Sequence, residues 1–261
     1  MGDVWAAGDE YEAYVGRWSR PVATEFVRWL GVAPGRRWLD AGCGTGALTG
    51  TVLTAAAPDR AVGVDTSPGF LRQAHGHLPG AGFAVADAAA LPLPDGVFDA
   101  VVSGLALNFV PRPQAAVDEF ARVAAPGGVV AAYVWDYTDG MAMMRHFWDA
   151  AVEVDPGAAA ADEGPRFPIC HPAALAAAWA GAGLAAVATR PIEVPTVFAG
   201  FDDYWRPFLG GQGAAPAYLA RLPEDRRAAI RDLLDDRLDR RPDGSIAMTA
   251  RAWAVRGVRP R

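Results

Sequence analysis

The stretch Leu39-Asp40-Ala41-Gly42-Cys43-Gly44-Thr45-Gly46 decides how this chain folds. It stands between a short run of strand character, 37–40, and an apolar run of helix character, 47–56. Glycine turns the chain tightly and lets a ligand approach the backbone and the amino end of the following helix. The stretch therefore predicts a strand, a ligand-binding turn and a helix in succession.

The segments after this turn alternate between strand and helix character. A second strand is expected over 61–65, which completes a strand–helix–strand unit. Further elements are expected as helix 68–77, strands 82–86 and 98–103, helix 114–125, strand 128–135 after a Pro126-Gly127-Gly128 turn, helix 141–154, a helix and a strand within 172–194, a charged helix 224–240 and a last strand 245–255. Such alternation predicts an α/β fold, with a parallel sheet covered by helices on both faces.

Composition narrows the classes of protein that this chain can be. Its 261 residues permit one large α/β domain, and 52% hydrophobic content is ample for its core. A formal charge of −6 opposes a protein that binds nucleic acid by neutralising phosphates. The 24 basic residues are all arginine, which excludes Schiff-base chemistry and the lysine of a phosphate-binding P-loop.

The chain also carries signals about its compartment. Two cysteines, Cys43 and Cys170, cannot build a disulfide framework, and the first residues lack the basic flank and apolar run of a signal peptide. The uncharged run 172–188 is interrupted by glycine and is marginally short for a span of about 20 residues. We therefore expect a cytoplasmic protein without a membrane segment.

Three carboxylates are expected at the ends of three successive strands: Asp40, Asp65 and Asp87. The glycine pattern also fits a dinucleotide site, in which Asp65 would bind ribose hydroxyls, so a nicotinamide- or flavin-dependent enzyme is one alternative. However, Asp40 beside a pyrophosphate would be repelled by it. A ligand without phosphate that carries an ammonium group would be attracted, and S-adenosylmethionine is such a ligand. Asp87 can accept from an adenine amino group.

At these residues the chain resembles the class I S-adenosylmethionine-dependent methyltransferases of the small-molecule type. The similar pieces are the glycine stretch 39–46, the strand end 62–65, the turn 86–88, the segment 91–103 and the segment 122–128, in family order. The resemblance covers about 36–135 and implies a Rossmann-like, seven-stranded, mostly parallel sheet whose last strand, 245–255, is antiparallel.

The resemblance also implies roles for individual residues. Gly42, Gly44 and the backbone of Cys43 would line the methionine portion of the cofactor. Asp65 would hold the ribose, and Asp87 would read the adenine amino group. The other implied contacts are Thr66 and Ala88 beside the adenine, and the carbonyl of Ser103 near the amino-acid end.

One position departs from the family pattern. Many small-molecule members carry a histidine shortly after the fourth strand, whereas Asn108 stands here in about that place. A catalytic role for that histidine therefore does not transfer. The Asn/Asp/Ser-Pro-Pro-Tyr signature of methyltransferases that act on nucleic-acid amino groups is absent as well, because Gly104 follows Ser103.

Candidate acceptor-side residues lie outside the glycine stretch. Tyr14 and Trp18 could place aromatic rings beside the sulfonium, or could simply pack a helix on the sheet. His146, expected on the helix after the fifth strand, and Asp136, at the end of that strand, are the candidates for proton transfer. Without a lysine and without the family's histidine, we expect a reaction driven mainly by proximity.

Two other constellations have plainer explanations. His75 and His77 form a pair at a helix end without a third ligand, so no metal site is predicted there. Cys170 and His171 stand in a proline-bracketed connector, which favours a structural role over a thiol nucleophile.

The sequence thus predicts a single domain, 1–261, with a cofactor-binding core at 32–136 and lid segments at about 1–20, 138–170 and 200–242. The expected enzyme transfers a methyl group from S-adenosylmethionine to a small, apolar or aromatic metabolite, as in small-molecule biosynthesis, and leaves S-adenosylhomocysteine. The expected protein is a monomer or homodimer that needs no metal, nucleic acid or membrane. The alternatives are the nicotinamide-dependent oxidoreductase and a protein of the same fold that binds the cofactor without methylating.

Overall fold

The computed structural model describes residues 16–210 and 213–261, so the candidate Tyr14 lies outside the described part. Within that part, no helix combines the length and the apolar character that crossing a membrane requires.

A seven-stranded sheet forms the framework, in the order β3-β2-β1-β4-β5-β7-β6. Its strands are β1 (Arg37–Ala41), β2 (Arg60–Asp65), β3 (Gly82–Val85), β4 (Phe98–Gly104), β5 (Ala124–Trp135), β6 (Ala185–Phe198) and β7 (Ile246–Val258). The pairs β1–β2, β2–β3, β1–β4 and β4–β5 are parallel, whereas β7 is antiparallel to β5. The predicted fold class, including the antiparallel last strand, is confirmed.

The chain divides into two compact units. The larger comprises Ser19–Trp135, Ile169–Ile192 and Ala252–Arg261, and the smaller comprises Met1–Trp18, Asp136–Pro168 and Glu193–Arg251. The predicted cofactor core, 32–136, falls in the larger unit except for Asp136. The predicted lid segments fall almost entirely in the smaller unit.

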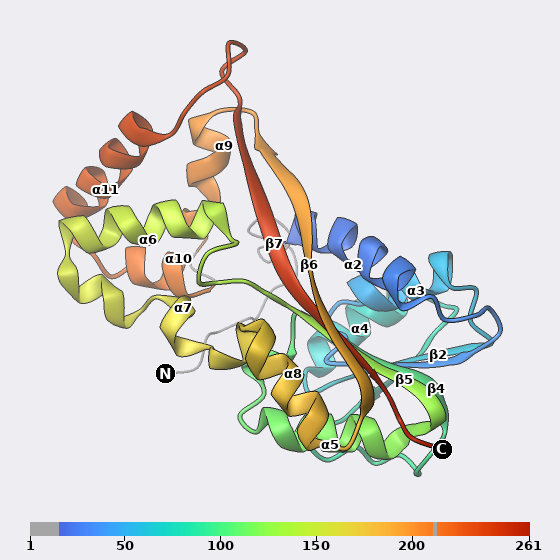
Figure 1. Ribbon diagram of the computed structural model, residues 1–261. Coiled ribbons are helices and arrows are strands. Elements are labelled where there is room, and N and C mark those ends of the chain that lie inside the picture. The colour runs from blue at the N-terminus through green and yellow to red at the C-terminus, as the bar shows by residue number, and fades with distance from the viewer. Residues whose placement is uncertain (1–15, 211–212) are drawn as a thin grey trace. The chain divides into compact units, whose positions relative to one another are not determined.

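Helices cover both faces of the sheet in the larger unit. They are α2 (Arg17–Leu30), α3 (Ala47–Ala55), α4 (Pro68–His77), α5 (Pro113–Val123), α8 (Pro172–Gly181) and the short 3-10 helices η2 (Leu107–Phe109) and η4 (Pro168–Cys170). Figure 1 shows α2, α3 and α4 over one face, and α5 beside α8 over the other. The indole N–H of Trp179 on α8 donates to the carbonyl oxygen of Val130 at 2.8 Å and thereby ties this helix to β5.

The segment before β5 differs from the prediction. The expected helix 114–125 ends at Val123, because Ala124 already pairs with Phe98 of β4. The next paired residues are Ala100 and Val129, so residues 125–128 bulge out of the ladder. Gly127 adopts φ +78° within this bulge. The Pro-Gly-Gly sequence therefore forms a bulge inside β5 instead of a turn before it.

Aromatic side chains fill the interior of the smaller unit. Its helices are α6 (Ala142–Val154), η3 (Pro156–Ala160), α7 (Glu163–Arg166), α9 (Phe201–Trp205), η5 (Arg206–Leu209), α10 (Ala214–Leu219) and α11 (Glu224–Arg237). The rings of Phe147 and Phe208 stack at 4.6 Å, and the hydroxyl of Tyr204 donates to the carbonyl oxygen of Met143 at 2.9 Å. The lid segments supply five rings, from which the sequence predicts an apolar or aromatic acceptor. They are Trp148, Phe201, Tyr204, Trp205 and Phe208, and all five are buried in this core.

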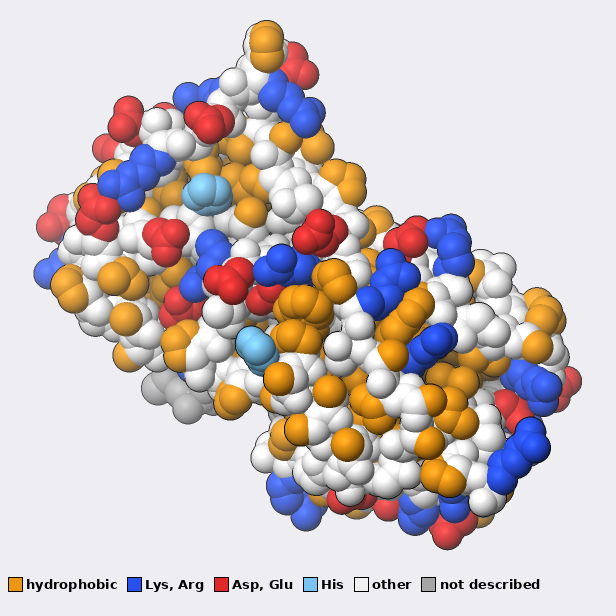
Figure 2. Space-filling view, in the orientation of Figure 1, with side chains coloured by type: hydrophobic (Ala, Val, Ile, Leu, Met, Phe, Trp, Pro, Cys, Tyr) orange, Lys and Arg blue, Asp and Glu red, His pale blue; other side chains and the backbone are white. Residues whose placement is uncertain are grey.

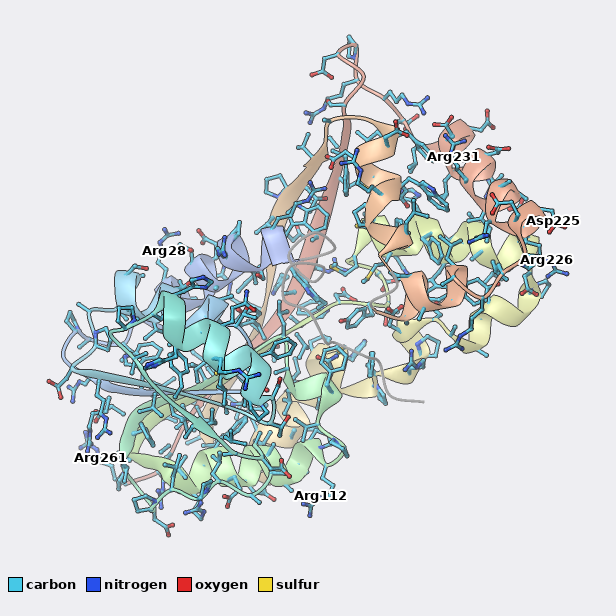
Figure 3. All side chains as sticks on the ribbon, turned by 180° about the vertical axis from the view of Figure 1, so that it is seen from behind. Arg28, Arg112, Asp225, Arg226, Arg231 and Arg261 are labelled. Carbon is cyan, nitrogen blue, oxygen red and sulfur yellow. The ribbon has the colours of Figure 1, made fainter. Side chains whose placement is uncertain are left out.

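Helix α11 carries charged side chains along its length, some of which are labelled in Figure 3. Arg226 pairs with Asp155 at 3.3 Å, and the guanidinium of Arg231 lies 5.4 Å from the ring centre of Phe201. Figure 2 shows acidic and basic side chains interspersed on the visible face of the molecule. These charges serve a solvated surface with local ion pairs.

Candidate functional site

The turn between β1 and α3 requires its glycines. Gly42, Gly44 and Gly46 have φ values of +76°, +53° and +91°, which side chains rarely adopt. A Cβ atom on Gly42 would lie 2.5 Å from the Cβ of Ala106, after β4. A Cβ on Gly44 would meet no atom within 4 Å. The turn is thus tightly packed at Gly42 and open at Gly44, where a ligand has room to approach.

Four backbone N–H groups of this turn already have acceptors. Those of Gly42 and Cys43 donate to the carbonyl oxygen of Val64, at 2.8 and 3.0 Å, and that of Gly46 donates to the carbonyl oxygen of Cys43 at 2.8 Å. The N–H of Gly44 donates to a carboxylate oxygen of Asp65 at 2.9 Å. A pyrophosphate bound here would have to compete for these donors. The arrangement favours a ligand without phosphate.

Asp65 fixes the shape of the turn. Its second carboxylate oxygen accepts from the N–H of Ser67 at 2.8 Å. The carboxylate therefore joins the end of β2 to the turn after β1. Each oxygen retains a further acceptor site for a ligand hydroxyl, which suits the predicted ribose contact. Sequence reasoning predicted the ligand role of Asp65 and missed this structural one.

Asp40 is a buried carboxylate with only part of its capacity used. The hydroxyl of Thr49, on α3, donates to Asp40 Oδ2 at 2.7 Å. Among the described residues, the buried Asp40 Oδ1 has no hydrogen-bond partner. The pKa of Asp40 is raised to about 7, mainly because burial disfavours the charged form. Hydrogen bonds from Thr49 oppose this rise, and the neighbouring charge of Asp65 adds to it. Such a carboxylate is ready to accept from a cationic donor.

The predicted adenine-side residues follow the ends of β2 and β3. Asp87 is exposed, and one of its carboxylate oxygens accepts from the N–H of Ala89 at 2.8 Å. The other oxygen can accept from an amino group. Thr66 is exposed and Ala88 is half-buried. The three residues lie on surface turns that a ligand can reach.

Two polar residues lie at the end of β4. The hydroxyl of Ser103 donates to the carbonyl oxygen of Ala41 at 2.7 Å, which binds β4 to the end of β1. Asn108, on η2, is 8% exposed, and within the described residues its amide Nδ2 has no acceptor. A buried donor without a partner marks a contact for a ligand. The sequence signal for Asn108 was its place where many family members carry histidine.

Cys43 contributes its backbone to the turn but not a reactive thiol. Its side chain is buried, and a Cβ on Gly63 of β2 would lie 2.8 Å from its sulfur. Burial raises the pKa of the thiol, and the charges of Asp40 and Asp65 raise it further. The thiol therefore stays protonated and serves packing.

Trp18 lies in the smaller unit, where its ring already has neighbours. It packs edge-on against Phe198, with ring centres 5.3 Å apart, and the guanidinium of Arg17 lies 4.6 Å from its centre. Arg17 in turn pairs with Asp203 at 3.2 Å. The cation above this ring is thus an arginine of the chain itself, which fits the packing alternative for Trp18. A contact with the cofactor stays a prediction.

The two candidates for proton transfer also lie in the smaller unit. Asp136 is buried and pairs with Arg251 at 2.7 Å, and it accepts from the N–H of Asp139 at 3.1 Å. His146, on α6, is exposed. Their catalytic roles stay predictions.

Comparison with known proteins shows what this part of the chain is similar to. Residues 39–132 match the family model described as a methyltransferase domain. A malonyl-[acyl-carrier protein] O-methyltransferase of Methylococcus capsulatus is 39% identical over 108 residues, which cover 40% of this chain and 39% of that protein. A trans-aconitate 2-methyltransferase of Methylobacterium nodulans is 38% identical over 136 residues, covering 51% of this chain and 50% of that protein.

Solved structures agree on the fold. The YcgJ protein of Bacillus subtilis superimposes with a TM-score of 0.61 at 17% identity, covering 92% of this chain and 99% of that one. This chain spans about half the length of the curated relatives it matches, and the matched part contains the turn, its carboxylates and Asn108. Residues 39–132 of this chain are thus similar to a methyltransferase domain, in agreement with the resemblance noted from the sequence.

Proposed function

We propose that this protein is a methyltransferase that binds S-adenosylmethionine at the turn after β1 and methylates a small molecule. The observation that carries the proposal is the Asp40 oxygen that has no hydrogen-bond partner among the described residues. It lies beside a glycine turn in which the N–H groups of residues 42, 43, 44 and 46 are already bonded. This combination suits a cationic amino group and disfavours a phosphate.

The residues present fit this cofactor. The free oxygen of Asp40 would accept from the ammonium group, and Asp65 from the ribose hydroxyls. The open side of Gly44 gives room for the chain that joins them. The remaining proposed contacts are the backbone of Gly42 and Cys43, the carbonyl of Ser103, and Thr66, Asp87 and Ala88 at the adenine.

When bound, S-adenosylmethionine supplies an electrophilic methyl group on a sulfonium. The work of this chain is to align the acceptor with that group and to exclude water. Asp136 is occupied by Arg251, and His146 is exposed, so neither is prepared as a general base in this structure. We therefore propose that proximity drives the reaction and that the acceptor is nucleophilic already or loses its proton through water.

The acceptor is proposed to be a small molecule. The two named relatives differ in acceptor, so their names do not select one for this chain. The apolar or aromatic character stays a prediction, because the rings on which it rests fill the core of the smaller unit. Salt tests it: acceptor affinity that falls steeply from low to moderate salt would indicate a polyanion.

Calorimetry with S-adenosylhomocysteine tests the cofactor assignment. We expect binding, and we expect Asp65→Ala to weaken it by about 1.5–3 kcal/mol, because two hydroxyls lose a charged acceptor. Asp65→Asn should recover part of the loss by keeping one acceptor oxygen for the turn. The control is Asp59→Ala, which removes an exposed carboxylate before the opposite end of β2. Unchanged affinity in Asp65→Ala would remove this residue from the site.

The two alternatives predict different results. A nicotinamide-dependent enzyme would bind the dinucleotide, which should then displace S-adenosylhomocysteine in a thermal-shift competition. A protein that binds the cofactor without methylating would give no labelled product with any acceptor, whereas a methyltransferase transfers label to one. Mass spectrometry of the ligand that copurifies is the most direct first measurement. The oligomeric state, monomer or homodimer, and the cytoplasmic location stay predictions.

A further inference from the structure

The hydroxyl of Thr49, in the first turn of α3, bonds a side chain outside its own helix. A threonine inside a helix commonly donates to the carbonyl oxygen four residues before it. Thr51, on the same helix, does so, to Ala47 at 3.0 Å. Thr49 instead donates across to Asp40 of β1 at 2.7 Å, and both side chains are buried.

This contact makes the two carboxylate oxygens of Asp40 differ in their hydrogen bonding. Oδ2 is held by Thr49, while Oδ1 is buried without a partner among the described residues. Buried carboxylate oxygens ordinarily accept several hydrogen bonds, and an unused one costs free energy. A carboxylate fixed at one oxygen and open at the other is arranged to receive a donor from a ligand.

We propose that Thr49 is a positioning residue: its hydroxyl holds one oxygen of Asp40 and thereby directs the other toward the ammonium group of the bound cofactor. The inference rests on the proposed function and adds a residue that touches neither the cofactor nor the acceptor.

The charges around Asp40 give this bond a second consequence. Burial opposes the ionised form, and the carboxylate of Asp65 and the thiol of Cys43 lie close enough to interact with it. Neither neighbour supplies a positive charge, and no ion pair joins Asp40 to an arginine in the described part of the chain. Hydrogen bonds from the hydroxyl and from the backbone N–H of Thr49 favour the ionised carboxylate, and the hydroxyl contributes the larger part. Loss of the hydroxyl should therefore raise the pKa of Asp40 further above about 7.

The test is calorimetric binding of S-adenosylhomocysteine between pH 6 and 9. Thr49→Val keeps the shape of the side chain and removes the donor. We expect affinity to fall about tenfold or more at pH 7, the loss of one charge-assisted hydrogen bond, and to approach the wild-type value as the pH rises. Thr49→Ser should restore both the affinity and its pH dependence. Thr51→Val is the matched control and should leave both unchanged.

A second readout needs no ligand. Carbon-13 NMR of the carboxyl groups, with Asp40 assigned through Asp40→Asn, should give a higher pKa for Asp40 in Thr49→Val than in the wild type. If the wild type binds and Thr49→Val has the same affinity and pH profile, the inference is overturned. A uniform loss at every pH, with an unchanged pKa of Asp40, overturns it as well and indicates general damage. If the wild type does not bind S-adenosylhomocysteine, the proposed function is wrong, and the cofactor role of Thr49, which rests on it, is wrong as well.

Discussion

Two buried aspartates, one in each unit, are held in opposite ways. Asp40 at the end of β1 and Asp136 directly after β5 are each 3% exposed. The partner of Asp40 is the neutral hydroxyl of Thr49, and one of its oxygens is left free. Asp136 faces the guanidinium of Arg251 and a backbone N–H. Burial alone therefore does not separate the two carboxylates, whereas the incomplete set of partners at Asp40 makes it the candidate for ligand binding.

The surroundings of Asp136 explain why its carboxylate is bonded within the protein. Its backbone N–H donates to the carbonyl oxygen of Arg251, and the N–H of Arg251 donates to the carbonyl oxygen of Gly140. A Cβ on Gly140 would lie 2.6 Å from the Cβ of Arg251. The carboxylate thus secures a tight turn, 136–140, against β7. Its place at the end of a sheet strand suggests catalysis, which stays a prediction beside this structural role.

The largest effect should follow from removing the cation beside Asp136. Arg251→Met leaves a buried carboxylate without its charge partner, which typically costs about 3–5 kcal/mol of folding free energy. Urea unfolding of the purified variant measures it. Arg240→Met, which breaks an exposed pair with Asp235, should cost less than about 1 kcal/mol. Equal costs for the two variants would show that the pair at Asp136 is not special.

Asp40 should produce a smaller effect with an opposite pH signature. Because its pKa rises from about 3.9 unfolded to about 7 folded, the folded state keeps the proton longer, and stability falls as the pH rises from about 4 to about 7. Asp40→Asn should abolish this fall, by at most about 4 kcal/mol at pH 8. The difference between the two proteins, measured by urea unfolding across pH, isolates Asp40.

Other carboxylates in the chain supply the internal control for that measurement. Hydrogen bonds from arginine, first of all, lower the pKa of Asp99 and of Glu119. Their stabilisation is present at neutral pH and is lost on acidification, in the wild type and the variant alike. A difference between the two proteins that grows on acidification would therefore contradict the role given to Asp40.

Asn108 extends the comparison from acceptors to donors. Its unpartnered amide costs the free protein stability, so Asn108→Leu should raise the free energy of unfolding by about 1 kcal/mol while weakening ligand binding. Thermal unfolding and calorimetry, done side by side, measure the two changes. If both stability and affinity fall, Asn108 is a structural residue whose amide has a hydrogen-bond partner in the free protein.

The smallest effect is expected at His146. Because its side chain is exposed, His146→Ala should leave stability nearly unchanged and lower the methyl-transfer rate by less than about tenfold, below the 10²–10⁴ of a general base. Single-turnover rates from pH 6 to 9 decide it. A loss beyond a hundredfold, with a pH dependence of the rate that vanishes in the variant, would establish His146 as the base.

Sequence reasoning succeeded where local chemistry determines the structure. The glycines of 42–46 and the carboxylates at the strand ends depend on backbone conformation and on the rule that parallel strands end at one edge, and both can be read locally. The antiparallel last strand came from the family resemblance, and the pairing of β7 with β5 confirms it.

Sequence reasoning failed where a residue's partner lies far along the chain. Asp136 meets Arg251, 115 residues away, and Trp18 meets Phe198. No periodicity or motif in the sequence predicts such pairs. The bulge at 125–128 was missed for a similar reason, because it depends on how β5 is registered against β4. Thr49 was overlooked because a threonine in an apolar helix has no distinguishing pattern.

The position of β7 has a consequence for how this chain acquires its fold during synthesis. Although β7 (Ile246–Val258) follows β5 by more than a hundred residues, it lies between β5 and β6 in the sheet. While the ribosome is still making the segments before it, β5 has no neighbour on that side and exposes unpaired N–H and C=O groups along an apolar strand. Such an edge invites pairing with other chains. The nascent protein is thus most vulnerable to aggregation in the interval between the emergence of β5 and that of β7.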